Sequence, residues 1–398
     1  MISSSPTLVL TEHFLPTQGG SITWLVQTYS RYNPAEVLFV AGRCVGDQEI
    51  DQTLPFKVKR IPMTMADWDP TRPASLRSYV QMLRDLRKIC HCHQVRQIHC
   101  AKVLPEGFVA WGNWYLTSTP YVLYAHGEEI LISMTSHKLR WLVPRIYNGA
   151  AAIIANSSHA KSLLENIGVQ LRKVYVVHPG VDARSFQVSQ EAILAVRQRY
   201  KLGNSPTLLT MGRLQRRKGQ DMVIKALPRI IQKIPTVKYL IVGTGEEYSA
   251  LQKLVQKVGV TNHVIFVGQV SDEERAVYYA TCDVFVMPNR QIDEDIEGFG
   301  IVFLEAGAAG KPVIGGKSGG TGEAIKEGVT GLRVDGTDVE EIATAALALL
   351  SDPSKSYTMG ENGRRRVKEE FSWETVVRRT YEVAARVDQE KKRIHHGK

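Results

Sequence analysis

The chain has 398 residues, of which 43% are hydrophobic and 23% are charged, and its net charge is +10 at pH 7. This composition excludes an intrinsically disordered chain, and the length favours two or three globular domains. No run of about 18 apolar residues occurs, so we expect no membrane-spanning helix. The start "MISSSPTLVLTEHF" lacks the features of a signal peptide, and five scattered cysteines predict a reduced, cytoplasmic protein.

Short apolar segments alternate with amphipathic helical patterns along most of the chain. In the first half the apolar segments are 7–14, 36–43, 96–102, 120–127, 151–157 and 173–180, with helical patterns at 75–89 and 159–168. In the second half they are 207–213, 238–245, 263–269, 283–288 and 311–316, with helical patterns at 220–234, 248–259 and 271–282. The last pattern opens with a capping box, Ser271 to Glu274. This alternation predicts parallel sheets covered by helices on both faces.

We therefore expect an α/β protein with two doubly wound, Rossmann-like domains that face each other across a cleft. The first domain is expected at residues 1–182 and the second at 183–372, with the boundary in "HPGVDARSF". A final helix at 373–390 is expected to pack back on the first domain. Ligands of open parallel sheets bind beyond the carboxyl ends of the strands, so functional residues are expected in the loops there.

Two such loops in the first half carry candidate residues. Gly19 and Gly20, in "PTQGGS", follow the first strand, where paired glycines let backbone N–H groups approach an anion at a helix N-terminus. A plain tight turn explains these glycines equally well. His126, in "YAHGEE", ends another predicted strand. A lone histidine is more often structural, but a position facing the cleft favours a function.

The loop "GRLQRRKG" follows the first strand of the second half and is strongly basic. Arg213 offers a planar fork and Lys218 a point charge, a combination that suits a diphosphate. The alternative is a solvated basic loop, which is how we interpret Arg216 and Arg217.

Glu297 and Glu305 bracket seven residues without charge, in "EGFGIVFLE". Eight residues of helix rise roughly 12 Å, which is too far for two carboxylates to act on one bond. They favour instead an elongated ligand with hydroxyl groups at both ends, such as a nucleoside diphosphate sugar. The backbone N–H groups of Phe299–Ile301, at the start of the predicted helix, would face its phosphates.

Together, "GRLQRRKG", the Glu297–Glu305 spacing, "EAGAAGKPVI" and "SGG" at 318–320 resemble the retaining glycosyltransferases of family 4, which have the GT-B fold. The resemblance covers nearly the whole chain. The segment "MPNRQIDEDIEGFGIVFLEA" especially resembles bacterial mannosyltransferases that act on phosphatidylinositol mannosides.

The resemblance implies a catalytic set in which Arg213 and Lys218 stabilise the leaving diphosphate, Glu297 holds the donor sugar and His126 lies beside it. It further implies that Glu305 binds the ribose hydroxyls. The full set of donor-binding positions that we expect is Gly19, Gly20, Arg213, Lys218, Val270, Glu297, Gly298, Phe299, Gly300, Ile301 and Glu305.

Two patterns suggest a metal, and we expect none. "ICHCHQVRQIHC" has cysteines and histidines at spacings that fit no familiar zinc site, and it is predicted to be a helix end followed by a strand. The pairs Asp67/Asp69 and Asp293/Asp295 are interpreted as loop carboxylates. We therefore expect metal-independent activity without a resident cofactor.

These observations predict a retaining hexosyltransferase that uses a nucleotide sugar and acts on a lipid-linked glycan or glycolipid in envelope or exopolysaccharide synthesis. UDP-glucose is slightly favoured as donor, with GDP-mannose as the alternative. A sugar-nucleotide epimerase or a phosphorylase of the same fold is a rival, and a nucleic-acid partner is not expected because no basic stretch has interleaved aromatics. The protein is expected in the cytoplasm, attached peripherally to the anionic inner face of the plasma membrane by a basic helix with Arg77, Arg84, Arg87 and Lys88.

Overall fold

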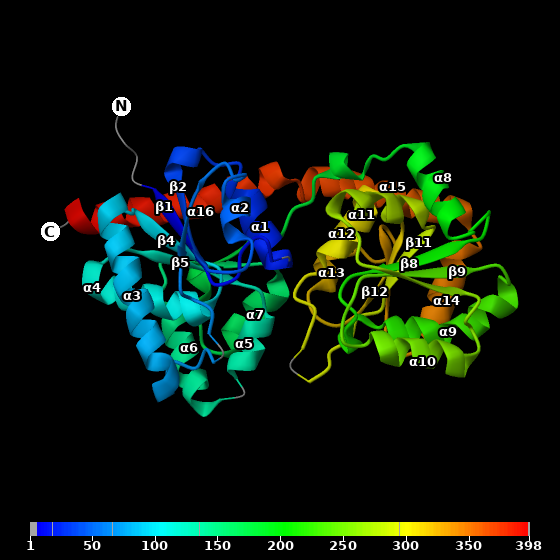
Figure 1. Ribbon diagram of the computed structural model, residues 1–398, viewed down its shortest axis with the longest axis horizontal. Helices are drawn as coiled ribbons and strands as arrows, with labels where there is room; N and C mark the ends of the chain where they lie inside the picture. Colours follow the sequence, from blue (N-terminus) through cyan, green and yellow to red (C-terminus); the bar gives the residue numbers. More distant parts are fainter. Residues whose placement is uncertain (1–5, 18, 66, 135, 294, 397–398) are drawn as a thin grey trace. The chain divides into compact units, whose positions relative to one another are not determined.

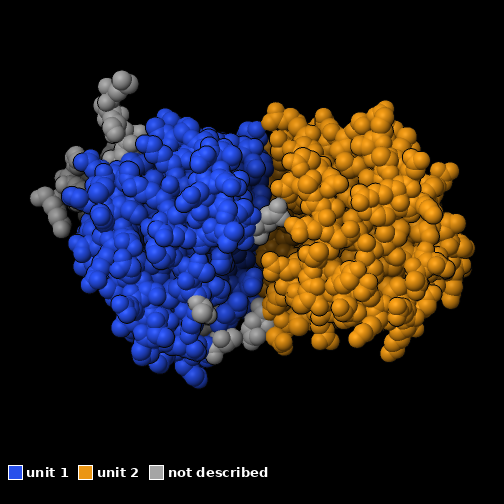
Figure 2. All heavy atoms as spheres, in the orientation of Figure 1, with its two compact units in different colours: residues 1–179, 373–398 blue, residues 180–372 orange. Residues whose placement is uncertain are grey.

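The computed structural model describes residues 6–17, 19–65, 67–134, 136–293 and 295–396. The chain divides into two compact units, which are residues 1–179 with 373–398 (unit 1) and residues 180–372 (unit 2) (Figure 2). The first break lies three residues before the expected boundary at 182. Each unit is a parallel sheet covered by helices, so the predicted pair of Rossmann-like α/β folds is confirmed (Figure 1). The cleft between them stays a prediction.

Unit 1 contains a seven-stranded parallel sheet in the order β3-β2-β1-β4-β5-β6-β7. Its strands are β1 (Thr7–Thr11), β2 (Val37–Gly42), β3 (Lys57–Ile61), β4 (Gln97–Cys100), β5 (Tyr121–Ala125), β6 (Ala152–Ala155) and β7 (Val174–Val176). Its helices are α1 (Gly20–Tyr29), α2 (Asp47–Asp51), α3 (Pro73–His93), α4 (Phe108–Thr117), α5 (Glu128–Ser133), α6 (His137–Gly149), α7 (Ser158–Asn166) and α16 (Trp373–His396).

The two faces of this sheet have separate cores because successive strand residues point to opposite sides. Leu8 and Leu10 of β1 pack with apolar side chains of α3, α4 and α6. Val9 packs on the other side with Trp24 of α1 and with Trp373, Val376, Val383 and Val387 of α16. Helix α16 therefore belongs to the core of unit 1, and it continues to His396, six residues beyond its expected end.

Unit 2 contains a six-stranded parallel sheet in the order β10-β9-β8-β11-β12-β13. Its strands are β8 (Thr207–Met211), β9 (Lys238–Val242), β10 (Val264–Gly268), β11 (Val284–Met287), β12 (Val313–Gly316) and β13 (Gly331–Val334). Its helices are α8 (Gln190–Arg199), α9 (Gln220–Lys233), α10 (Tyr248–Val258), α11 (Asp272–Thr281), α12 (Ile301–Ala308), α13 (Thr321–Ala324), α14 (Val339–Leu350) and α15 (Pro353–Glu370). The capping box predicted at Ser271 and Glu274 is confirmed at the start of α11.

Each of the eleven apolar segments found in the sequence contains a strand, but two strands were missed. Both lie at the edge of a sheet: β3, with the sequence KVKRI, and β13, with the sequence GLRV. Edge strands are half solvated and tolerate charged side chains, so they lack the continuous apolar run that marks a central parallel strand. Among the described helices, none is both long enough and apolar enough to cross a bilayer.

Candidate functional site

The candidate site in unit 2 lies where the strand order of the sheet reverses. Strands β8 and β11 are neighbours, but the chain continues from β8 toward one edge and from β11 toward the other. In open parallel sheets, ligands bind beyond the carboxyl edge at such a reversal, because the loops after the two strands lead to opposite faces. The β8 loop carries "GRLQRRKG", and the β11 loop ends at the Glu297 segment. Two of the sequence clusters thus meet at one place.

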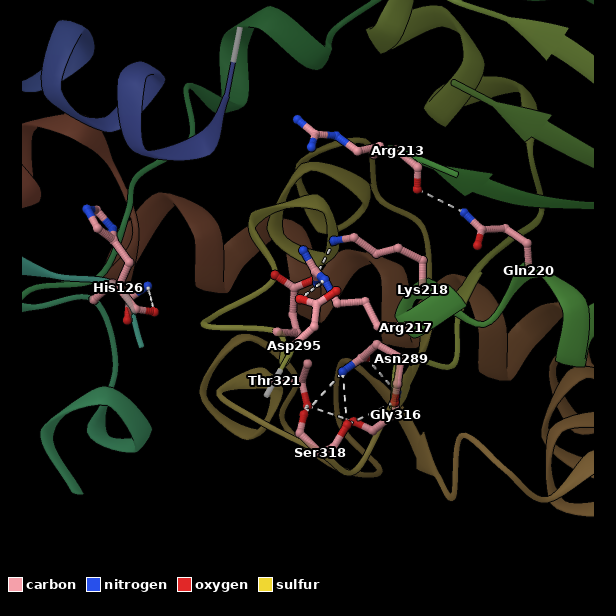
Figure 3. Close-up of polar contacts among 12 residues, drawn as sticks. His126, Arg213, Arg217, Lys218, Gln220, Asn289, Asp295, Gly316, Ser318 and Thr321 are labelled. Carbon is pink, nitrogen blue, oxygen red and sulfur yellow. Dashed lines mark hydrogen bonds and ion pairs between the residues drawn. The ribbon is translucent and has the colours of Figure 1, made fainter. Parts of the chain in front are cut away.

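Four charged side chains from these two loops form one ion cluster (Figure 3). Oε2 of Glu297 accepts hydrogen bonds from Nη1 of Arg217, at 2.8 Å, and from Nζ of Lys218. Nε of Arg217 also lies 2.7 Å from Oδ1 of Asp295. The side chains of Arg217, Lys218 and Glu297 are only 12–13% exposed. Water therefore screens these charges weakly, and their interaction is stronger than on an open surface.

The cluster keeps Glu297 ionised. Burial by itself would raise the pKa of this carboxyl, but the neighbouring charges of Lys218 and then Arg217 outweigh burial and lower the pKa to about 2. Burial lowers the pKa of Lys218, and Glu297 opposes that shift. Asp295 differs, because burial raises its pKa more than Arg217 lowers it.

Arg290 holds the β8 loop in place. Its guanidinium holds both carboxylate oxygens of Asp221, at 2.9 and 3.0 Å, and its backbone N–H donates to the carbonyl of Arg217 at 2.8 Å. Arg290 is 8% exposed, so the bidentate pair is well shielded from water. Asp221 lies in the first turn of α9, and Arg290 follows β11. The pair thus joins the two loops that form the site.

The segment "SGG" holds the backbone of Glu297. The N–H of Gly320 donates to the carbonyl of Glu297 at 2.9 Å. Gly319 has a φ of +72°, and a Cβ there would lie 2.1 Å from the same carbonyl oxygen. Only glycine tolerates both the conformation and the close approach. The sequence motif at 318–320 therefore positions Glu297.

Helix α12 begins at Ile301, directly after the turn that carries Glu297. Gly300 precedes it with a φ of +85° and supplies no side-chain cap. The amide groups of the first helical turn thus emerge beside the cation cluster, where they favour an anion. Because the helix begins only at Ile301, Glu297 lies outside it, and the expected helical rise of about 12 Å between the two glutamates is wrong.

Glu305 lies within α12 and has different partners from Glu297. Its two carboxylate oxygens accept hydrogen bonds from Nη2 of Arg275, at 2.5 Å, and from the hydroxyl of Tyr279, at 2.6 Å. Both partners come from α11, and Glu305 is 7% exposed. A carboxylate has about four acceptor positions, so these two bonds orient Glu305 and leave acceptor capacity for a ligand.

Two further predicted donor-binding residues flank the cluster. Arg213 is exposed, and Figure 3 shows its side chain extending to the same side as that of Lys218. Its carbonyl accepts a hydrogen bond from Gln220 at 3.3 Å. Val270 follows β10 and packs partly against the core that contains Phe299. Phe299 itself is buried, with its ring 5.9 Å from that of Phe371. Its side chain therefore belongs to the core, and only its backbone is placed for a ligand.

In unit 1, Gly19 and Gly20 lie at the start of α1, between β1 and the helix, as the sequence predicted. Gly19 is extended, and an added Cβ would meet only Ile22, at 3.8 Å; at Gly20 no neighbour lies within 4 Å. The fold of unit 1 therefore does not itself require glycine at either position. A ligand that approaches the backbone closely would require it.

His126 follows β5, and its ring is held firmly. Nε2 lies 3.0 Å from the carbonyl oxygen of Ala101, so this nitrogen carries the proton and Nδ1 remains an acceptor. The ring packs edge-on against Trp24, and the backbone N–H of His126 donates to Glu129 at 2.7 Å. Burial lowers the pKa of His126, although Glu129 opposes this, so the neutral imidazole is favoured.

The residues of the two patterns that resemble metal sites belong to a helix end, a strand and loop turns. Residues 90–93 are the end of α3, as expected, and 97–100 form β4. Asp67 pairs with Arg72 at 2.6 Å, whereas Asp69 caps its own turn through Thr71. Within the described ranges, no group of three or more His, Cys, Asp and Glu side chains could hold a metal ion.

Sequence reasoning missed several residues of the site. Arg217 was interpreted as part of a solvated loop, and the structure corrects this, because its side chain is only 13% exposed and contacts both Asp295 and Glu297. Arg275, Tyr279 and Arg290 were not considered. Each is recognisable only by a partner on another element, 26 to 69 residues away. Apart from the cationic run itself, the sequence carried no signal for them.

The chain is similar to known proteins over most of its length. A family model described as Glycosyltransferase Family 4 matches residues 13–185, and one described as Glycosyl transferases group 1 matches residues 194–366. A Mycolicibacterium smegmatis protein named GDP-mannose-dependent alpha-(1-6)-phosphatidylinositol monomannoside mannosyltransferase is 32% identical over 374 residues. The alignment covers 92% of this chain and 95% of that relative.

Two further comparisons extend over similar lengths. A Corynebacterium glutamicum protein, named GDP-mannose-dependent monoacylated alpha-(1-6)-phosphatidylinositol monomannoside mannosyltransferase, is 30% identical over 389 residues, or 94% of this chain and 96% of the relative. The crystal structure of Anabaena HepE in complex with UDP superimposes with a TM-score of 0.83 at 21% identity, over 96% of this chain and 99% of that one. At this identity, the likeness to HepE is evidence about the fold only.

Proposed function

Because the chain belongs to glycosyltransferase family 4 and has the GT-B fold, we propose that it is a retaining α-mannosyltransferase that uses GDP-mannose and acts on a phosphatidylinositol mannoside or a related glycolipid. The sequence slightly favoured UDP-glucose. Two relatives that are 30–32% identical over more than 90% of the chain are named as GDP-mannose-dependent, and they support the alternative donor.

The observation that carries the proposal is the shared pairing of Arg217 and Lys218 with Glu297 at the switch point of the sheet. Arg217 and Lys218 balance the charges of Asp295 and Glu297, and the exposed Arg213, nearby in sequence, adds a third positive charge. A diphosphate fits this charge, since it accepts charge-assisted hydrogen bonds from Lys218 and from the amides at the start of α12. Glu297 would then turn its oxygens to the sugar hydroxyls.

The same groups would lower the barrier to transfer. As the bond between the sugar and the diphosphate breaks, negative charge accumulates on the leaving phosphate oxygen. Lys218 and Arg217 are already held in place by Glu297 and need little reorganisation, which is the condition under which electrostatic stabilisation is largest. Arg290 contributes indirectly, by holding the carbonyl of Arg217.

Glu305 and His126 are proposed to bind hydroxyl groups. Glu305, oriented by Arg275 and Tyr279, has acceptor positions left for the two ribose hydroxyls. In unit 1, Nδ1 of the neutral His126 can accept one hydrogen bond from a sugar hydroxyl. Gly19 and Gly20 would let the backbone of unit 1 approach the phosphates.

A glycolipid acceptor implies that the protein works at a membrane surface. The basic helix predicted for this role is α3, and its residues Arg77, Arg84, Arg87 and Lys88 are all exposed. We propose that this helix faces anionic headgroups of the cytoplasmic leaflet.

A donor panel in the presence of a chelator tests the function. We would measure thermal stabilisation and nucleotide release with GDP-mannose, UDP-glucose, UDP-galactose and ADP-glucose, and mannose transfer to extracted phosphatidylinositol mannosides. GDP-mannose alone should stabilise the protein and support transfer, and Lys218→Ala should abolish both. A response only to a UDP-sugar would overturn the donor, and transfer that requires Mn²⁺ or Mg²⁺ would overturn the metal-independent site.

A further inference from the structure

An apolar pocket lies on the surface of unit 1, and none of its lining residues is a proposed donor-binding residue. Its volume is about 530 Å³, and its lining includes Pro70, Thr71, Phe108, Lys138, Trp141 and Leu142. The pocket is formed by the loop before α3, the start of α4 and the first turns of α6. Its volume falls within the range of small-molecule sites, roughly 300–1,000 Å³.

Exposed apolar side chains lie at the rim of this pocket and along α4. Trp141 is 59% exposed at its rim, and Tyr115 is 67% exposed on α4, where Trp114 and Leu116 are exposed as well. The rings of Phe108, Trp111, Tyr115 and Trp114 follow one another at centroid distances of 4.8–6.1 Å, so an aromatic row leads from the pocket along α4. Scattered apolar residues are ordinary on a surface, but a contiguous group of this kind marks an interaction site.

Two of the three helices that carry this surface, α3 and α6, are strongly basic. Helices α3, α4 and α6 together contain seven Lys and Arg residues and one acidic residue, Asp85. Helix α4 has no charged residue at all. On α6, the guanidinium of Arg145 lies 3.8 Å from the centre of the Trp141 ring. Aromatic rings with basic side chains beside them are typical of a surface that lies at the boundary between headgroups and acyl chains.

We propose that this pocket binds an acyl chain of an anionic membrane glycerophospholipid. The chain would enter between Thr71 and Trp141, while the rings of Trp114 and Tyr115 lie at the depth of the headgroups and the basic residues contact phosphates. A second copy of this protein fits poorly, because two such basic surfaces would repel each other. This inference shares one premise with the proposed function, which is that the protein works at a membrane surface. It adds a lipid site that donor chemistry does not require.

The first test uses dioctanoyl phosphatidylglycerol below its critical micelle concentration, titrated into the full-length protein. Thr71→Trp would fill the pocket from an exposed position. The matched control is Tyr357→Ala, which removes a 70% exposed aromatic ring from unit 2. The wild type and Tyr357→Ala should bind the lipid saturably, and Thr71→Trp at least 10-fold more weakly. Equal binding by Thr71→Trp, or no saturable binding by the wild type, would overturn the proposal.

A second test uses vesicles with 30% anionic lipid and a nitroxide quencher on the acyl chain. The nitroxide should quench tryptophan fluorescence less in Trp141→Phe than in the wild type, because the proposal places the Trp141 ring in contact with the acyl chains. Quenching that is the same in both proteins would contradict the acyl-chain site. A concentration-dependent dimer that Thr71→Trp dissociates would instead identify a protein interface. Thermal stabilisation by GDP-mannose should be unchanged in both variants, so failure of the donor assignment and failure of the lipid site are separable.

Discussion

Lys218 and Glu297 lie 79 residues apart in the chain and form a mostly buried ion pair at the switch point of the second sheet. Arg217 donates to the same carboxylate oxygen. The chain thus supplies its own anion for the two cations that are proposed to hold the donor diphosphate. A diphosphate would compete with Glu297 for these cations, and that competition gives the site a distinctive response to mutation.

Glu297→Gln should separate nucleotide binding from transfer. The neutral amide no longer competes for Lys218 and Arg217, so we expect GDP to bind several-fold more tightly by isothermal titration calorimetry. Mannose transfer should fall by about 100-fold or more, because an amide is a poorer acceptor for the sugar hydroxyls. Glu369→Gln, on the exposed surface of α15, serves as the charge-matched control. Weaker GDP binding by Glu297→Gln would contradict the competition.

Glu305→Ala should act mainly on the donor affinity. Loss of hydrogen bonds to a charged group costs about 1.5–3 kcal/mol, so KM for GDP-mannose should rise about 10- to 100-fold with a smaller change in kcat. Tyr279→Phe removes one of the two groups that orient Glu305 and should have a weaker effect of the same kind. The wild type should prefer GDP to 2′-deoxy-GDP, and Glu305→Ala should not. A kcat effect alone would instead place Glu305 at the reacting bond.

Gly20→Ala tests whether the start of α1 approaches a ligand. A Cβ at this position meets no neighbour within 4 Å, and alanine favours helix over glycine, so stability should stay unchanged or rise by about 0.5 kcal/mol. Transfer should nevertheless fall at least 10-fold if the backbone contacts phosphates. Gly112→Ala is the matched control within α4, where the new methyl group would meet Leu83 at 3.6 Å. Full activity of Gly20→Ala would show that the glycine only forms a turn.

Glu106 should make unit 1 less stable as the pH rises. It is 1% exposed, and burial raises its pKa from 4.5 to about 8, although the backbone N–H of Glu12 donates to it at 2.7 Å. The folded state therefore holds a proton that the unfolded chain releases above pH 4.5. The free energy of unfolding therefore decreases by on the order of a few kcal/mol between about pH 4.5 and 8. Above pH 8 this contribution no longer changes.

Glu106→Gln removes this titration while its amide oxygen can still accept the Glu12 N–H. The melting temperature of this variant should therefore exceed that of the wild type by a margin that grows from pH 5 to pH 8 in scanning calorimetry. Glu165→Gln, on the exposed side of α7, should follow the wild type throughout. A constant margin across this pH range would contradict a buried, protonated Glu106.

Much of the fold could be predicted because the strands of a parallel sheet have a sequence pattern that is visible within a few residues. A central strand is buried on both faces, so segments such as 121–125 and 284–287 are continuous apolar runs that a single stretch of sequence reveals. The helix starts were equally local: the Ser271–Glu274 box involves residues three apart. The edge strands β3 and β13 were not predicted, because polar residues on their solvated side interrupt the apolar run.

The sequence by itself determined which loops carry the site, since "GRLQRRKG" and the Glu297 segment each follow an apolar strand. It did not distinguish Arg216 from Arg217, which are adjacent and chemically identical. The tertiary structure decided that Arg217 turns inward to Glu297 and Asp295, while Arg216 is exposed. In the same way, only the packing of α11 against α12 shows that Arg275 and Tyr279 orient Glu305. The partner of a charge, and the water excluded around it, depend on elements far away in sequence, so local pattern records the charge but not its environment.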